Sequence, residues 1–324
     1  MPGIEDLSLA QVKELVAGAR PEPGDELWDA LASDPRRGVA DLLAQIARQA
    51  ARARAERERL AALRLDEAAL WAAGARHVAG VDEAGRGPLA GPVVAAAVVL
   101  PENADLPGLD DSKKLTPAKR EELFARIALE ATAVGVGSAS EKVIDETNIL
   151  SATLSAMRDA VAALAVRPDH VIVDGTSLPE MDVPRTAIPR GDERSAAIAA
   201  ASVVAKVTRD RLMADLDATY PGYGFAQHKG YGTSEHVAAL ARLGPCEIHR
   251  RSFGLVMEAS GGWSVSFIGY RSRLLSADSR AALDRIGAEI ARVKDSIPPH
   301  ELSRLRGIYT RAQRRVSAGV SPKR

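Results

Sequence analysis

The chain has 324 residues, a length that corresponds to about two domains at roughly 150 residues each. Its 43 Lys and Arg balance 43 Asp and Glu, which excludes a polybasic protein that binds nucleic acid through bulk positive charge. Hydrophobic residues make up 46% of the chain, which excludes a disordered acidic protein, and aromatic residues make up only 4%, which argues against an aromatic platform for single-strand binding.

Charge divides the chain into three segments, which we predict to be separate domains. Residues 1–76 hold 11 basic and 13 acidic side chains and are predicted to be helical, since the stretch 39–65 is rich in Ala, Leu and Arg. Residues 77–258 hold 19 basic and 25 acidic side chains and consist of short apolar runs broken by Gly and Pro. Residues 259–324 hold 13 basic and 5 acidic side chains, a net charge of +8, and begin with a linker-like Ala-Ser-Gly-Gly sequence.

The middle segment is predicted to form a mixed α/β sheet. Its strands are expected where apolar residues run together or alternate with small and polar ones. These stretches are residues 77–81, 92–100, 132–140, 171–173 and 185–188.

Helices are predicted between these strands and after them. A Thr-Pro pair predicts a helix over 116–130, because a hydroxyl suits the N-cap and proline suits the first turn. Periodic apolar residues and a long Ala-rich stretch predict helices over 147–165 and 195–219. In the last segment, a helical piece is expected over 276–316, with an interruption at the Pro-Pro pair 298–299.

Two adjacent carboxylates, Asp82 and Glu83, end the first apolar strand and precede a glycine-rich turn. Two acids beside a buried run repel one another without a cation, whereas Mg²⁺ and Mn²⁺ prefer hard oxygen ligands, so we interpret both as metal ligands. The same stretch also matches a dinucleotide-binding fingerprint, with Gly85, Gly87 and Ala90 in the spacing G-x-G-x-x-A. However, prolines and a Val-rich strand follow, where that fold requires a helix.

Further acids follow later elements of the sheet. Asp174 ends the strand at 171–173, and Asp192 precedes the long helix. Asp192 has two interpretations that the spacing does not separate, since it could be a metal ligand or the N-cap of that helix. The other acids nearby, which we interpret as loop residues, are Glu180, Asp182 and Glu193.

Basic residues cluster around these acids in the sequence. Singly, each is typical of a solvated surface, but together they could hold the phosphates of a duplex without reading its sequence. His228 could face a substrate, whereas His77 and His170 lie in apolar contexts and are interpreted as structural. The basic residues are Lys113, Lys114, Lys206, Arg209, Lys229, Arg250 and Arg251.

Seven ordered blocks within about residues 76–258 carry a family resemblance. They are VDEAGRGPLAGPVV (81–94), DSKKL (111–115), VDG (173–175), RGD (190–192), IAAASVVAKVTRD (198–210), YGFAQHKGYGT (223–233) and GPCEIHRRSF (244–253). In this order they resemble bacterial ribonuclease HII. One GRG sequence would be a weak signal, whereas seven blocks in the same order are highly specific.

The resemblance implies a ribonuclease H-like fold, a mixed β-sheet flanked by helices, with helical extensions at 1–76 and 259–324. It also implies an endonuclease that cuts the RNA strand of RNA–DNA hybrids and incises on the 5′ side of ribonucleotides embedded in duplex DNA. The expected reaction is a two-metal hydrolysis with Mn²⁺ or Mg²⁺ that yields a 3′-hydroxyl and a 5′-phosphate. The carboxylates that match the family's metal ligands are Asp82, Glu83, Asp174 and Asp192.

Substrate-binding residues also follow from the resemblance. The backbone of Gly85, Arg86 and Gly87 is expected to hold the 2′-hydroxyl of the ribonucleotide, where only glycine allows close approach. Tyr231 is expected to stack under the sugar at the junction. The basic residues that we expect to contact the substrate are Lys113 and Lys229.

Two alternative functions belong to different classes. One is a DNA-acting nuclease of transposase or resolvase type on the same superfamily fold, and the other is a non-catalytic scaffold that binds nucleic acid through the basic tail. The expected partners are RNA–DNA hybrids and DNA duplexes that contain ribonucleotides. The C-terminal extension is expected either to add salt-dependent duplex affinity or to dock a protein partner.

The chain is expected to act as a monomer in the cytoplasm and not at a membrane. The single cysteine, Cys246, cannot form an intrachain disulfide, which suits a reducing compartment. The first eight residues lack the basic start of a signal peptide. The longest apolar stretch, residues 88–100, is too short and too broken by Gly and Pro to cross a bilayer.

Overall fold

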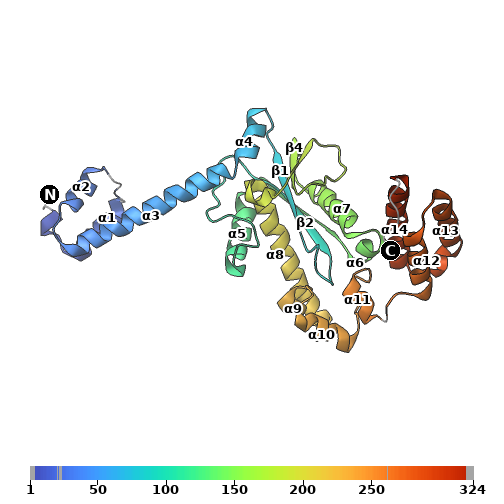
Figure 1. Ribbon diagram of the computed structural model, residues 1–324. Helices are drawn as coiled ribbons and strands as arrows, with labels where there is room; N and C mark the ends of the chain where they lie inside the picture. The colour runs from blue at the N-terminus through green and yellow to red at the C-terminus, as the bar shows by residue number, and fades with distance from the viewer. Residues whose placement is uncertain (1–3, 20, 22–23, 261, 319–324) are drawn as a thin grey trace. The chain divides into compact units, whose positions relative to one another are not determined.

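The computed structural model describes residues 4–19, 21, 24–260 and 262–318 (Figure 1). It separates into two compact units, Met1–Leu63 and Arg64–Arg324. The last residues of the predicted basic extension, 319–324, and Gly261 of its linker lie outside the described part of the chain.

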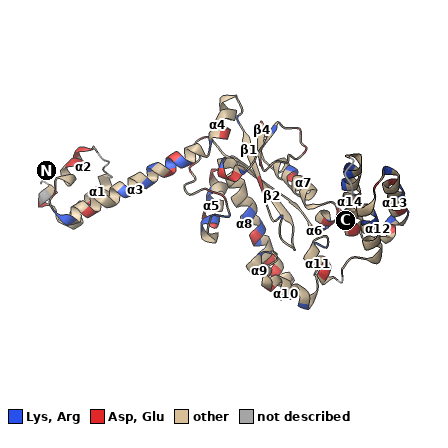
Figure 2. Cartoon of the chain, in the orientation of Figure 1, with Lys and Arg blue, Asp and Glu red and all other residues tan. Residues whose placement is uncertain are grey.

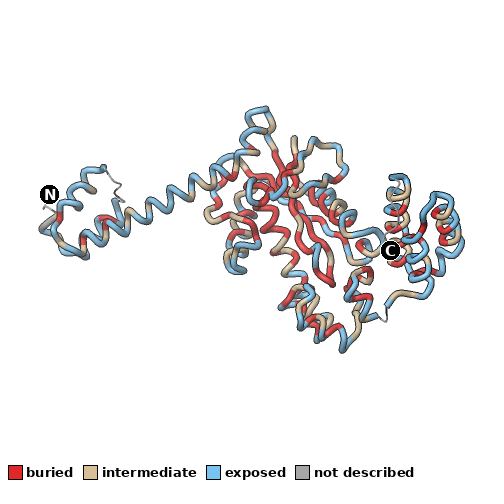
Figure 3. Tube along the Cα trace, in the orientation of Figure 1, coloured by how far each residue is buried: buried red, intermediate tan, exposed pale blue. Residues whose placement is uncertain are grey.

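The N-terminal unit is helical, as predicted. Its core is small and includes Val12, Leu31 and Val39. No residue of the last helix beyond Leu43 is buried, so most of that helix is exposed along its length (Figure 3). Basic and acidic residues are interleaved on it (Figure 2), as is typical of a solvated helix. The elements are η1 (Ile4–Asp6), α1 (Leu9–Ala19), α2 (Glu26–Ala32) and α3 (Arg37–Ala62).

The second unit contains a five-stranded sheet in the order β3-β2-β1-β4-β5. Strands β1, β2 and β3 pair antiparallel, whereas β4 pairs parallel to β1 and β5 pairs parallel to β4. All five predicted strands are confirmed, and the first continues through its two acids to Ala84. The strands are β1 (Val78–Ala84), β2 (Val93–Val99), β3 (Ala133–Ala139), β4 (His170–Asp174) and β5 (Arg185–Ile188).

Two long helices cover opposite faces of this sheet (Figure 1). Helix α7 (Ile149–Ala162) packs on the face that includes Val81, and α8 (Ala196–Thr219) packs on the face that includes Gly80. The approach of α8 is so close that a Cβ atom at Gly80 would lie 2.2 Å from the carbonyl carbon of Ala197. The helix predicted over 116–130 is α5 (Pro117–Glu130), and the Thr116 hydroxyl accepts a hydrogen bond from the Lys119 N–H, as a cap should.

Shorter helices complete the second unit before its C-terminal part. Helix α4 follows a turn after α3, so the helix predicted over 39–65 ends earlier than expected. The buried Glu67 of α4 accepts hydrogen bonds from the Ser195 hydroxyl and the Ala197 N–H at the start of α8. The short helices are α4 (Leu65–Ala72), α6 (Glu141–Glu146), α9 (Phe225–His228), α10 (Ser234–Leu243) and α11 (Gly254–Ala259).

The C-terminal part has its own core, in which Phe267, Leu274 and Leu305 are buried. The expectation that its helices begin at Ser276 was wrong, because its first helix begins at Val265 and ends at Ser276. Exposed apolar residues such as Val265 blur the periodic pattern of that first helix. Helix α14 begins at the Pro-Pro pair, as predicted. The elements are α12 (Val265–Ser276), α13 (Arg280–Val293), η3 (Lys294–Ser296) and α14 (Pro299–Ser317). Among the described helices, none has the length and apolar character to cross a membrane.

Candidate active site

The predicted carboxylates gather where parallel strands end. Val81 of β1 pairs with Val173 of β4, so the next residues, Asp82 and Asp174, are neighbours across the two strands. Asp192 lies in the short helix η2 (Gly191–Glu193), which follows β5. Ligands of open α/β sheets commonly bind at the carboxyl ends of parallel strands, and the sequence-predicted acids occupy that position.

Strand alternation sends the two adjacent acids to opposite faces of the sheet. The Asp82 side chain is buried and forms a hydrogen bond with Ser202 of α8. Glu83 lines a cavity of about 220 Å³ on the other face, together with Asp174 and Met157 of α7. Asp82 and Glu83, which are adjacent in the sequence, therefore point to opposite faces of the sheet. They remain close enough to repel one another.

Burial and repulsion raise the pKa values of Asp82 and Glu83. Burial raises the pKa of Asp82 well above its usual value, and the neighbouring charges of Glu83 and Asp174 raise it further. Burial also raises the pKa of Glu83, whereas the Arg86 guanidinium, 3.1 Å from its Oε1, opposes that rise. A negative charge on Asp82 or Glu83 is therefore unfavourable at this end of the sheet.

Asp192 is in the same electrostatic situation. Burial raises its pKa, and the carboxylates of Asp111 and Asp174 add to the shift. The Lys113 ammonium opposes it from 3.5 Å and also lies 3.7 Å from Asp111. Burial lowers the pKa of Lys113, but the carboxylates of Asp111, Asp192 and Asp82 outweigh that effect and raise it. Lys113, which we expected at the substrate, lies among the carboxylates.

The open question of the helix cap is answered by Ser195. Its hydroxyl accepts a hydrogen bond from the Ile198 N–H at 3.1 Å and is the N-cap of α8. Asp192 lies one turn earlier, so it does not cap this helix. Its neighbour Gly191 donates its N–H to Asp174 Oδ1 at 2.6 Å, which ties η2 to the end of β4.

The glycine-rich turn after β1 leads into a strand and not a helix, so the dinucleotide-binding alternative was wrong. Gly85 has a φ of +93°, and a Cβ atom there would lie 2.0 Å from the Arg209 Nε, so only glycine fits. A Cβ atom at Gly87 would lie 3.7 Å from the ring of Tyr231. The fold therefore brings Tyr231, which is 42% exposed, against the turn.

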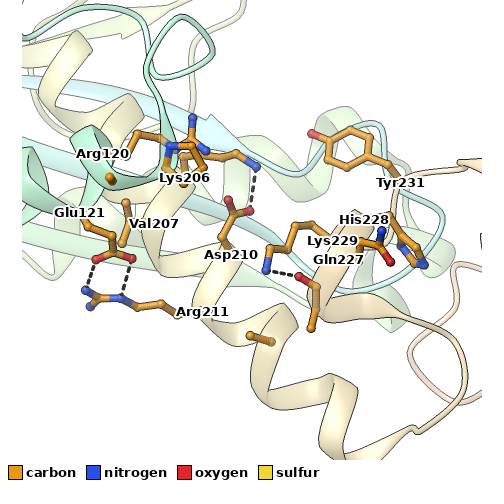
Figure 4. A pocket seen from close by; sticks show the side chains of 14 residues that line it. Arg120, Glu121, Lys206, Val207, Asp210, Arg211, Gln227, His228, Lys229 and Tyr231 are labelled. Carbon is orange, nitrogen blue, oxygen red and sulfur yellow. Dashed lines mark hydrogen bonds and ion pairs between the residues drawn. The ribbon is translucent and has the colours of Figure 1, made fainter.

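A groove of about 760 Å³ continues from Tyr231 along α8 (Figure 4). Lys206 Nζ lies 5.9 Å from the centre of the Tyr231 ring and 2.7 Å from Asp210 Oδ1. Lys229 also lines the groove and donates to the Ala226 carbonyl oxygen at 2.6 Å. The other basic residues of the groove are Arg120 and Arg211.

His228 lies at the edge of this groove but is engaged within the protein. Its Nε2 lies 2.8 Å from the Tyr223 carbonyl oxygen, and its Nδ1 accepts a hydrogen bond from the Gly230 N–H at 3.2 Å. Both ring nitrogens are used, and the side chain is buried. We conclude that His228 supports the loop that carries Tyr231.

Sequence reasoning misjudged four buried polar residues near the site. It gave no site role to Asp111 and Ser202, and it counted Arg209 and Arg250 among the basic residues that could hold phosphates. Asp111 lies two residues before Lys113 in the DSKKL block (111–115), and this proximity was the one sign in the sequence that it could belong to the site. Nothing in the sequence indicates that Ser202 reaches Asp82, or that two arginines are buried under the glycine-rich turn. The expectation that these two arginines hold phosphates was wrong, because Arg209 and Arg250 are buried and donate to main-chain carbonyls.

The donor chemistry suits a hard divalent cation, because four carboxylates with like-charged neighbours are grouped at one edge of the sheet. Among the described residues, no three His, Cys, Asp or Glu side chains are arranged so that they would hold a metal ion without moving. The carboxylates have partners in the chain instead, such as Arg86 for Glu83 and Lys113 for Asp192. An ion would exchange these two contacts for its own.

Comparisons with known proteins identify the family of the chain. Residues 79–256 match the family model described as Ribonuclease HII, and residues 8–71 match the model of the Ribonuclease HII N-terminal domain. The ribonuclease HII of Geobacillus thermodenitrificans (strain NG80-2) is 56% identical over 237 residues, which are 73% of this chain and 91% of that protein. The ribonuclease HII of Desulfitobacterium hafniense (strain Y51) is 49% identical over 258 residues, 80% of this chain and 98% of that protein.

A solved structure supports the fold independently. The crystal structure of the ribonuclease H2 from Pyrococcus horikoshii OT3 has a TM-score of 0.50 and 28% sequence identity, and the match covers 57% of this chain and 97% of that one. The ribonuclease H-like fold that the sequence blocks implied is confirmed. Since the family model covers more than half of the residues, this chain belongs to the ribonuclease HII family.

Proposed function

We propose that the chain is an endoribonuclease that hydrolyses the RNA strand of RNA–DNA hybrids and incises on the 5′ side of ribonucleotides embedded in duplex DNA. Its family makes it a metal-dependent hydrolase of the ribonuclease H type. The single observation that supports the proposal best is the position of the Gly85–Gly87 turn. It directly follows the acids of β1 and lies against Tyr231, so a site for hydrolysis adjoins a backbone that can approach a sugar.

The metal ligands would be Asp82, Glu83, Asp174 and Asp192, and the ions would be two of Mn²⁺ or Mg²⁺. Bound divalent ions lower the pKa of water and stabilise the leaving oxygen of a phosphodiester. The protein's own part would be to hold the acids near the ends of β1 and β4 and in η2, and to keep Asp82 buried against α8. Arg86 and Lys113 balance part of the acidic charge and would be released toward substrate phosphates.

Recognition of the ribonucleotide would fall to the turn and the groove. Main-chain groups of Gly85, Arg86 and Gly87 would contact the 2′-hydroxyl, which distinguishes RNA from DNA at one nucleotide. Tyr231 would stack under the adjoining sugar, and Lys229 would approach a phosphate from the groove. These contacts involve backbone and phosphate, so they would not depend on base sequence.

We assign catalysis to residues 77–258 and treat 1–76 and 259–324 as extensions of a monomer. The C-terminal extension would add duplex affinity through its basic side chains, and that affinity would fall as salt rises. A protein partner docked on the extension is the competing role. The cytoplasm is the compartment that suits the single cysteine.

The test uses three labelled duplexes: an RNA–DNA hybrid, a DNA duplex with one ribonucleotide, and an all-DNA duplex. Each is incubated with full-length protein in Mn²⁺, Mg²⁺ or a chelator. We expect cutting of the first two only, only with metal, and 5′ of the single ribonucleotide with a 3′-hydroxyl product. Cutting of all-DNA duplex would favour the transposase-type alternative, and binding without any product would favour a scaffold.

A further inference from the structure

Two fully buried guanidinium groups lie under the Gly85–Gly87 turn. Arg209 is 1% exposed and Arg250 is 0% exposed. Burial lowers the pKa of Arg209 to about 10 and that of Arg250 to about 9, so both stay charged at neutral pH. Burying a charge is costly unless polar partners surround it, so the identity of these partners matters.

Every hydrogen bond that these two guanidiniums make within the described residues goes to a main-chain carbonyl. Arg250 donates to the carbonyl oxygens of Gly85, Arg86 and Gly91, at 2.6, 2.9 and 2.9 Å. This fork of donors spans the segment from Gly85 to Gly91, which lies two residues before β2. Lysine could not span it, because its donors radiate from a single nitrogen.

Arg209 continues the same arrangement. It donates to the carbonyl oxygens of Ala90, Pro92 and Lys229, at 3.0, 2.9 and 2.9 Å. The Lys229 contact matters because Tyr231 is two residues further along. One buried side chain therefore ties the glycine-rich turn to the loop that carries Tyr231.

These contacts fix the direction of the peptide N–H groups. All described peptide bonds are trans, so each N–H points opposite to the carbonyl of the same peptide unit. The Gly85 and Arg86 carbonyls point inward to Arg250, and the N–H groups of Arg86 and Gly87 must therefore point outward. Neither N–H has an acceptor among the described residues. Two donors are thus presented to the outside, beside the carboxylates.

We propose that Arg250 and Arg209 are positioning residues for ribonucleotide recognition: they hold the turn with the N–H groups of Arg86 and Gly87 directed at the substrate, and they set Tyr231 beside it. This inference rests on the proposed function and specifies how the site recognises its substrate. The ligand of the two N–H groups is the ribose 2′-hydroxyl or the phosphate next to it. Neither arginine touches the substrate.

The test compares Arg250→Lys with Arg185→Lys, whose guanidinium donates to the Met181 carbonyl oxygen at 2.8 Å outside the site. Both are made in an Asp174→Asn background, which is expected to bind without cutting. Affinity is measured for a DNA duplex with one ribonucleotide and for the all-DNA duplex of the same sequence, and a thermal melt follows each protein. The ratio of the two affinities is the readout that a purely structural role would not change.

We expect the parent and Arg185→Lys to prefer the ribonucleotide duplex, and Arg250→Lys to lose at least about tenfold of that preference with little change toward all-DNA duplex. Retained preference in Arg250→Lys would overturn the positioning role alone. A parent protein without any preference would overturn the proposed function and the positioning role together. If Arg250→Lys does not fold, Arg209→Lys is judged by the same ratio.

Discussion

Two buried charge clusters of opposite sign meet at the carboxyl end of β1. In the acidic cluster (Asp82, Glu83, Asp174, Asp192 and Asp111), burial and neighbouring carboxylates raise the pKa values of Asp82, Glu83 and Asp192, and the cationic partners are Arg86 and Lys113. In the guanidinium cluster (Arg209 and Arg250), six main-chain carbonyls surround two cations. We propose that bound metal ions complete the first cluster, whereas the second has its partners within the chain. The acidic cluster therefore has the character of a binding site, and the guanidinium cluster has that of the scaffold that supports it.

The largest expected effect is on catalysis. Asp82→Asn or Asp174→Asn should reduce cleavage below detection in Mn²⁺ or Mg²⁺ while the fold persists, because each removes a charge that the metals need. The matched control is Asp182→Asn, an exposed loop acid that should leave the rate unchanged. Cleavage of a single-ribonucleotide duplex is the assay, and full activity of either site variant would remove that residue from the acidic cluster.

The second prediction contrasts stability. Arg209→Ala should lower the free energy of unfolding by about 3–5 kcal/mol, because three buried carbonyls lose their donor. Arg211→Ala, whose ion pair with Glu121 is exposed, should change it by less than about 1 kcal/mol. Urea unfolding measures both. Equal losses in the two variants would mean that the guanidinium cluster is not part of the scaffold.

A buried histidine pair gives the third prediction, on acid stability. His249 Nε2 lies 3.1 Å from His236 Nε2, and its Nδ1 accepts from the Cys246 N–H, so a further proton has no place there. Burial, with His236 nearby, lowers the pKa of His249 to about 4 from 6.5. Between those values the unfolded chain binds the proton more tightly, so stability is complete above pH 6.5 and is lost as the pH falls toward 4.

The loss from His249 should reach about 3 kcal/mol at the acid end of that range. His249→Gln should be less stable than the parent at pH 7 but lose less on acidification. Urea unfolding at several pH values tests this. Parallel curves for the two proteins would show that His249 does not control acid stability.

The smallest expected effect is a gain in stability. The pKa of Asp82 is raised in the folded state, so the folded chain binds that proton more tightly than the unfolded chain, and wild-type stability falls as the pH rises through this interval. Without divalent ions, Asp82→Asn should remove that loss and raise Tm at neutral pH by a few degrees, at about 2–4 °C per kcal/mol. A lower Tm would mean that the Asp82 charge is already compensated within the chain.

Local patterns predicted much of this fold and part of the site. Apolar runs and caps located the five strands and α5, α7 and α8, and acids at strand ends pointed to Asp82 and Asp174. Such signals depend on neighbours in the sequence, which is why they can be read there. The same reasoning left Asp192 undecided, because the true cap, Ser195, stands three residues away and obeys the same rule.

Long-range contacts could not be predicted. Arginine is usually exposed, and nothing near Arg209 or Arg250 in the sequence indicates burial under a turn more than 100 residues earlier. The position of Tyr231 against Gly87 likewise depends on how α8 and the following loops pack. The carboxylate site was therefore easier to predict from the sequence than the two buried arginines that we infer position the turn for substrate recognition.

The most direct test of the acidic cluster is a Mn²⁺ titration of the chelator-treated protein, in which Tm and cleavage of a single-ribonucleotide duplex are followed together. We predict that wild-type Tm and cleavage rise over the same Mn²⁺ range, because the ions complete the acidic cluster. Asp174→Asn should show neither rise. Cleavage by the wild type in chelator, or the same Tm rise in Asp174→Asn, would contradict the claim that these carboxylates form a metal site.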